Sequence, residues 1–175
     1  MLSLSCAPTP VDSLVATGES QIYEALESSL VKLRQTNRLV TGTVIRGRTY
    51  KLEDFNKLFN SGNANVPLKG MVSCTKNESV AVEFLSKSGS NISGPKVKVI
   101  MKIKSKSGVD IDDISDYGVN LVKDRHPEEL IQEEVLLDEG YFKMNGQPTL
   151  IKTENGVPRY EINLEELVTP IRKIN

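Results

Sequence analysis

The chain has 175 residues, of which 38% are hydrophobic and 26% are charged, as in ordinary globular proteins. This length suits one compact domain and is too short for two. The 22 Lys and Arg residues nearly balance the 23 Asp and Glu residues, so the formal charge is −1. Because no basic field is available to hold a polyphosphate backbone, we expect no nucleic-acid partner.

The sequence also lacks the patterns of metal, disulfide and membrane proteins. Cys6 and Cys74 form no CxxC pair and His126 has no second ligand nearby, so we expect neither a metal nor a disulfide framework. No apolar run approaches the roughly 20 residues that cross a bilayer, and the N-terminus has no classical signal peptide. The opening residues are small and polar. We therefore expect a flexible segment over residues 1–18, a single domain over residues 19–175 and no membrane partner.

In the first half of the chain, apolar residues recur mainly at helical spacing. The pattern predicts, in chain order, a helix over Ser20–Gln35, a short strand over Thr43–Arg46 that Gly47 ends, a helix over Leu52–Phe59, a strand over Lys69–Ser73, a helix over Glu78–Ser86 and a loop over Ser88–Pro95.

The second half is dominated by strand-like patterns. They predict strands over Val97–Lys104 (with one solvent-facing side), Val109–Ile111, Glu133–Leu137, Gly140–Met144, Thr149–Lys152 and Arg159–Asn163. Asn145-Gly146 predicts a hairpin turn from the Gly140–Met144 strand toward Thr149–Lys152, and Asn155-Gly156 predicts a second hairpin into Arg159–Asn163. Helices early and strands late favour an α+β domain with mainly antiparallel sheets. The absence of a GxGxxG motif and of a P-loop argues against a βαβ nucleotide fold.

Two strand ends carry candidate site residues. A guanidinium at Arg46, turned into a cleft beside Gly47, can grip a diphosphate through two parallel hydrogen bonds, although a surface arginine is the simpler interpretation of this residue alone. Arg48 is either a second phosphate ligand or, more simply, a solvent-facing arginine. The Ser73 hydroxyl, at a strand end just before a helix, can orient a carboxylate and contact a ribose. The alternative for Ser73 is an ordinary strand, turn and amphipathic helix.

The segment from Gln132 to Leu137 carries the third set of candidates. If Val135 and Leu137 enter the core, strand alternation puts Gln132 and Glu134 together on the opposite face. Two polar side chains there can act as a pair, one for a sugar hydroxyl and one for an acceptor. Because other acidic residues are near in the sequence, an acidic patch at the start of an edge strand is the alternative.

In their order along the chain and in their residue patterns, these three segments resemble the arginine–serine–glutamate class of mono-ADP-ribosyltransferases, which includes bacterial toxins and secreted effectors. The matching residues, between about Ser20 and Asn163, are Arg46-Gly47, then Ser73-Cys74-Thr75 with Ala81 and Phe84 on the following helix, then Gln132 and Glu134 followed by Val135-Leu136-Leu137. Cysteine replaces the central threonine of the family's Ser-Thr-Ser strand. The connection over residues 116–131 is longer than usual for the family, which affects the assignment of the target more than the NAD chemistry.

This resemblance implies an ADP-ribosyltransferase-like fold, with mostly antiparallel split β-sheets around an NAD cleft and helices at the N-terminal side. NAD is then a co-substrate, and no metal is needed. The implied roles are Glu134 for the ribose 2′-hydroxyl and the oxocarbenium charge, Ser73 for holding Glu134 and the ribose, Arg46 for the diphosphate, and Gly47 and Thr75 for further NAD contacts. Tyr117 contacts the nicotinamide or the target protein, or is simply a packed loop tyrosine.

The resemblance further implies that the chain transfers ADP-ribose from NAD to a host protein, such as a small GTPase or a ubiquitin-like protein. The neutral amide of Gln132 points to an Asn or Thr/Ser acceptor rather than Arg. We expect a monomer that is secreted without a classical signal peptide and acts in the host cytoplasm. Two alternatives stay open: an NAD glycohydrolase that uses water as the acceptor, and a catalytically silent protein-binding domain on the same fold.

Overall fold

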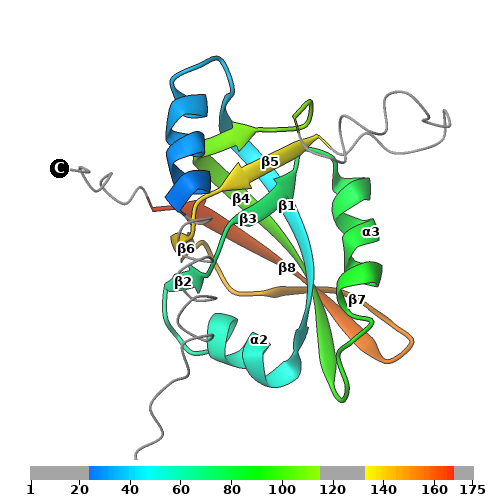
Figure 1. Cartoon of the computed structure of the whole chain (residues 1–175). Coiled ribbons are helices and arrows are strands. Elements are labelled where there is room, and N and C mark those ends of the chain that lie inside the picture. The colour runs from blue at the N-terminus through cyan, green and yellow to red at the C-terminus, as the bar shows by residue number, and fades with distance from the viewer. Residues whose placement is uncertain (1–23, 115–132, 168–175) are drawn as a thin grey trace, which may run out of the picture.

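The computed structural model describes residues 24–114 and 133–167 (Figure 1). Residues 24–34 are helical, and the later elements are β1 (Leu39–Lys51), α2 (Leu52–Phe59), β2 (Asn65–Leu68), β3 (Val72–Thr75), α3 (Glu78–Ser88), β4 (Lys96–Asp110), β5 (Glu134–Leu137), β6 (Gly140–Met144), β7 (Thr149–Glu154) and β8 (Val157–Glu166). Within the described ranges, no helix is long and apolar enough to cross a membrane.

The eight strands of the described residues belong to one hydrogen-bonded network in the order β1-β3-β5-β4-β8-β6-β2, with β7 paired to β8. Every pairing is antiparallel except the one between β4 and β8. Because β1 also pairs with β4 along most of its length, β1, β3, β5 and β4 form a closed ring. The ring is weakest between β1 and β3, where only Ile45 and Thr75 are paired. The predicted α+β class with mainly antiparallel strands is confirmed.

Both faces of the β1–β4 pair are covered. On one face lies the main core, where Phe55 and Phe59 of α2 are fully buried and the Phe55 ring lies 4.9 Å from the Tyr160 ring. On the other face, α3 packs through Ala81 and Leu85 in a smaller cluster (Figure 1). Burying a large apolar side chain contributes about 1.5–3 kcal/mol. The two aromatic residues of α2 therefore anchor this short helix firmly.

Two strands are longer than the sequence pattern predicts. Gly47 does not end β1, which continues to Lys51 because its partner β4 continues beside it. The two strands expected over Val97–Lys104 and Val109–Ile111 are one strand, β4.

Between the two expected strands, β4 does not break but contains a bulge. The register with β1 shifts between Val40 and Gly42, opposite Ser105 and Gly108. The buried carboxylate of Glu166 accepts hydrogen bonds from the backbone N–H groups of the two bulged residues, Lys106 (2.6 Å) and Ser107 (2.9 Å). A strand that carries an extra residue is locally unpaired, and this carboxylate takes the place of the missing partner.

Three smaller expectations are wrong. A strand over Lys69–Ser73 is replaced by β2 and β3, with Gly70 at φ +73° between them. Asn145-Gly146 does not pair β6 with β7, because β6 pairs with β2 and β8. The side of β4 expected to face solvent is partly covered, since Ile100 is buried beneath α3.

Several local predictions are confirmed. The bounds of α2 and β6 are as predicted, α3 ends two residues later than expected, and β7 and β8 form the hairpin that Asn155-Gly156 predicts. Both turn residues have positive φ, 51° for Asn155 and 76° for Gly156, which two-residue hairpin turns require. The predicted helix over Ser20–Gln35 is found over residues 24–34, while its first residues and the N-terminal segment 1–18 lie outside the described residues.

Candidate active site

Arg46 lies where β1 and β3 separate. Its neighbour Ile45 makes the single β1–β3 pair, and beyond it the Arg46 guanidinium spans the gap, donating from Nη1 to the backbone carbonyl of Ser73 at 2.8 Å. Burial lowers the pKa of Arg46 from its ordinary value, although an arginine stays protonated in a protein. Within residues 24–114 and 133–167, no carboxylate lies within ion-pair distance of this guanidinium. The cleft therefore contains a fixed positive charge that a neutral group holds in place.

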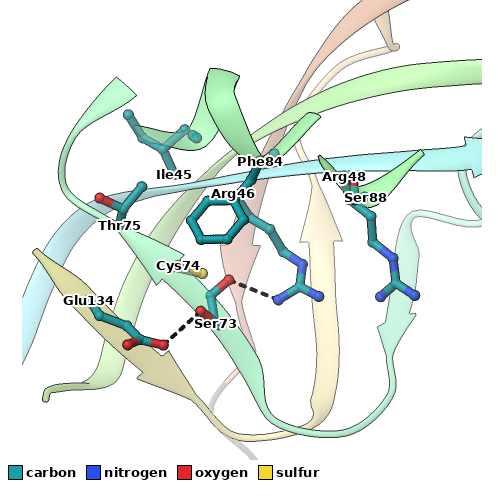
Figure 2. Close-up of a pocket in the computed structure, with 11 residues that line it drawn as sticks. Ile45, Arg46, Arg48, Ser73, Cys74, Thr75, Phe84, Ser88 and Glu134 are labelled. Atoms are coloured by element: carbon teal, nitrogen blue, oxygen red, sulfur yellow. Dashed lines mark hydrogen bonds between the residues drawn. The ribbon is translucent and has the colours of Figure 1, made fainter. Parts of the chain in front are cut away.

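Gly47 allows α3 to lie directly on β1. A Cβ atom at this position would lie 1.8 Å from the backbone oxygen of Ala81, which no real contact permits. The helix begins at an Asn77 cap, whose side chain accepts from the backbone N–H of Ser79 at 3.0 Å. Because α3 lies this close, its half-exposed Phe84 reaches the same cleft as Arg46 (Figure 2).

Ser73 and Glu134 meet across two neighbouring strands. The β3–β5 register pairs Ser73 with Leu136, so Ser73 and Glu134 are diagonal neighbours on one face of the sheet. Ser73 Oγ donates a hydrogen bond to Glu134 Oε1 at 3.0 Å, as Figure 2 shows. Alternation turns the intervening Cys74 into the core, where burial raises the pKa of its thiol to about 12. Cys74 is thus no nucleophile for this cleft.

The backbone around Glu134 is held from several sides. Its carbonyl accepts from the Ile111 N–H at 3.0 Å, and its own N–H points to Asp112 Oδ1 at 3.4 Å. The preceding residue, Glu133, has a left-handed φ of 46°, which is unfavourable for a residue with a side chain. Such backbone conformations concentrate at functional sites. No motif in the sequence marks Asp112, since its proximity to Glu134 depends on the pairing of β4 with β5.

These residues surround one cavity of about 410 Å³, within the size range of small-molecule sites (Figure 2). Its lining consists of Ile45, Arg46, Gly47, Arg48, Ser73, Cys74, Thr75, Ala81, Phe84, Ser88 and Glu134. The structure thus brings together five of the predicted site residues: Arg46, Gly47, Ser73, Thr75 and Glu134. The other two, Tyr117 and Gln132, lie outside the described residues. Ser88 was missed because only the length of α3 places it here.

The cavity contains charged groups but no cluster of metal ligands. Glu134 is the carboxylate of its lining, and Arg46 and Arg48 are its cations. In the described part of the chain, no group of three or more His, Cys, Asp or Glu side chains is placed to hold a metal ion. The arrangement suits a ligand that has an anionic part for the arginines and an electron-poor centre for the carboxylate.

Comparisons with known proteins find similarity in structure only. No family model and no curated protein sequence matches the chain. Among solved structures, the Vis toxin, an ADP-ribosyltransferase from Vibrio splendidus, aligns with a TM-score of 0.62 at 19% identity, covering 97% of this chain and 66% of the Vis chain. Vis in complex with agmatine gives the same TM-score and identity, over 93% of this chain and 64% of that one.

The chain therefore spans less than two thirds of the length of these chains. At this level of identity, the similarity concerns the arrangement of strands and helices and not the residues of the site. The chain has the ADP-ribosyltransferase fold.

Proposed function

We propose that this chain transfers ADP-ribose from NAD to a side chain of another protein. The observation that carries the proposal is the hydrogen-bonded row of Arg46, Ser73 and Glu134, which three different strands bring into one cavity. A guanidinium for phosphates, a hydroxyl and a carboxylate for a ribose are the groups that NAD cleavage needs. The ADP-ribosyltransferase fold supports the same proposal.

The proposed reaction breaks the bond between nicotinamide and C1′ of the ribose. The bonding electrons leave with nicotinamide, which becomes neutral, and the ribose gains oxocarbenium character as in glycoside cleavage. Glu134 accepts a hydrogen bond from the 2′-hydroxyl and stabilises this positive charge, while Ser73 holds the Glu134 carboxylate in position. The acceptor then forms a bond to C1′ and releases its proton to water.

The remaining predicted residues bind rather than react. Arg46 holds the diphosphate and thereby places C1′ beside Glu134, which converts binding of a remote group into correct orientation. Gly47 lets α3 lie against β1, so that Phe84 borders the bound NAD, and Thr75 borders the ribose. Tyr117, together with Gln132, is assigned to recognition of the target.

We further propose that the target is a host protein and that the chain acts as a secreted, monomeric bacterial effector or toxin in the host cytoplasm. The toxin named among the structural neighbours supports this setting. Hydrolysis of NAD by water is the second candidate, because the cavity is partly open and the same row of residues activates C1′ whatever the acceptor is.

Replacing Glu134 by Gln tests the proposal. We expect the rate of ADP-ribosylation in a eukaryotic lysate with labelled NAD to fall by a factor of about 10²–10³, because one preorganised electrostatic contact with the transition state is lost. Glu53→Gln is the matched control. It neutralises an exposed carboxylate on α2, whose ion pair with Lys57 contributes little to stability.

Circular dichroism of Glu134→Gln should match that of the parent, because Glu134 is only partly buried. Labelling at the parent rate by Glu134→Gln would refute the catalytic assignment. Rapid nicotinamide release from NAD without any protein target, lost in Glu134→Gln, would instead favour the glycohydrolase.

The acceptor preference of Gln132 is tested with agmatine, a small guanidinium compound that Vis binds in one of its structures. A guanidinium needs a carboxylate to orient or deprotonate it, and an amide cannot do this. We therefore expect no ADP-ribosyl-agmatine by mass spectrometry, and we expect Gln132→Glu to produce it. Formation of this product by the parent protein, or ADP-ribose on Arg of its protein target, would contradict the preference for Asn or Thr/Ser.

A further inference from the structure

The cavity has two chemically different ends. Strand alternation puts Arg46 and Arg48 on the same face of β1, and Figure 2 shows both side chains extending from the strand in the same direction. Glu134 lies on the other side of Ser73, whose carbonyl accepts from Arg46 and whose hydroxyl donates to Glu134. The cavity is therefore dipolar, with two positive charges at one end and one negative charge at the other.

Neutral groups hold both guanidiniums. Arg46 is fixed by the Ser73 carbonyl, and the Arg48 guanidinium carbon lies 5.3 Å from the centroid of the Tyr50 ring. Across the two described ranges, neither arginine has a carboxylate within ion-pair distance. Two other arginines do have such partners: Arg34 pairs with Asp138, and Arg38 with Asp113. Because no described carboxylate neutralises either positive charge in the cavity, we take both to be available to an anionic ligand.

Tyr50 makes Arg48 more than a flexible surface residue. Its ring is buried in the main core and lies edge-on to Phe59, with 5.7 Å between the ring centroids. A guanidinium stacked on a fixed ring loses less conformational freedom when it binds a ligand. The buried Tyr50 ring thus helps to hold the Arg48 guanidinium in one place, although the Arg48 side chain is exposed.

We propose that Arg48 is a second ligand of the NAD diphosphate, and that the Arg46–Arg48 pair and Glu134 together fix the direction in which NAD lies. This inference rests on the proposed function. NAD carries negative charge on both phosphates and positive charge on its nicotinamide ring, a distribution that matches the two ends of the cavity. The opposite orientation places the diphosphate against Glu134 and the nicotinamide ring against two arginines. Residues two apart on a strand are separated by about 7 Å, and two long arginine side chains can converge from that spacing on one diphosphate.

The test compares NAD and ADP binding by calorimetry in the parent, Arg48→Met and Arg159→Met. Arg159 lies on β8 and is not part of the cavity lining, so it controls for the loss of one arginine. We expect Arg48→Met to weaken both affinities by about tenfold or more, since hydrogen bonds to charged groups are stronger than neutral ones. We expect Arg159→Met to bind as the parent does.

Kinetics separate binding from a general structural effect. In Arg48→Met, KM for NAD should rise by the same factor, while kcat at saturating NAD should stay within about twofold, because Arg48 does not contact the reacting atoms. A damaged fold lowers kcat as well. If Arg48→Met does not fold, Arg48→Lys carries the test: it keeps the charge without the planar fork, and its NAD affinity should fall measurably below that of the parent.

The outcomes distinguish this inference from the proposed function. If the parent binds and cleaves NAD and the Arg48 variants bind NAD equally well, Arg48 is not a diphosphate ligand, but the proposed function stands. If ADP binding depends on Arg48 but no nicotinamide is released from NAD, the diphosphate site stands and the proposed function is wrong. If the parent binds neither NAD nor ADP, both are wrong.

Discussion

Adjacent residues on β3 have opposite chemical roles because a strand alternates its side chains. Ser73 is exposed and donates to Glu134, whereas Cys74 is 4% exposed and packs in the main core. The buried thiol is a small apolar residue whose sulfur faces the Val72 carbonyl at 3.7 Å. Of these two neighbouring residues, Ser73 thus belongs to the proposed active site and Cys74 to the core that supports it.

Cys74 should make the folded protein sensitive to alkali. Burial raises the pKa of its thiol from an ordinary value of 9.0 to about 12. Between these two pH values the unfolded thiol loses its proton and the folded one keeps it, so the free energy of unfolding falls as pH rises. One such group contributes a slope of at most about 1.4 kcal/mol per pH unit. Urea unfolding of the parent and of Cys74→Ala from pH 8 to 10.5 measures the difference.

In the Cys74→Ala variant, the free energy of unfolding should still fall at high pH because of Tyr50. Burial also raises the pKa of the Tyr50 phenol above its ordinary value of 10.0. Above about pH 10 the unfolded phenol therefore loses its proton while the folded one keeps it, and the free energy of unfolding falls. The variant should therefore lose stability later, starting nearer pH 10. Identical slopes for the two proteins between pH 9 and 10 would mean that Cys74 is not buried as a neutral thiol.

At the scale of elements, the contact between α3 and β1 depends on a residue without a side chain. Gly47→Ala forces a Cβ atom against the Ala81 backbone, which cannot move without shifting the whole helix. Overpacking of this kind costs about 1–3 kcal/mol. We expect that loss in the free energy of unfolding, measured with urea, and a weaker affinity for NAD because α3 lines the cavity.

Thr43→Ala is the matched control for Gly47→Ala, since Thr43 is exposed on the same strand. It should leave the free energy of unfolding within about 0.5 kcal/mol of the parent. If Gly47→Ala is as stable as this control, then α3 does not lie on β1 as closely as described.

The elements that the sequence predicted best are those with local causes. The apolar spacing of Leu52–Phe59 and the turn at Asn155-Gly156 need only neighbouring residues, and both are confirmed. The continuity of β4 could not be predicted, because the bulge that breaks its pattern is stabilised by Glu166, 60 residues beyond Lys106. The same holds for the pairing of β6, which depends on partners distant in the sequence.

Prediction of the site follows the same rule. Motif order pointed to Arg46, Ser73 and Glu134, and the structure places all three in one cavity. The contributions of Asp112 and of the Arg48–Tyr50 stack depend on strand pairing and core packing, which no short motif encodes. The catalytic roles themselves stay predictions until Glu134 is replaced.

For the molecule as a whole, the closed ring of β1, β3, β5 and β4 links distant parts of the chain. The Arg46–Ser73 hydrogen bond spans 27 residues and the Ser73–Glu134 hydrogen bond spans 61. Contacts of such long range form late and slowly during folding, because the loops between them must first be closed. A nascent or partly unfolded chain therefore carries the three residues without a working arrangement of them. A cell that makes this protein would be exposed to the proposed chemistry only once the last strand of the ring is in place.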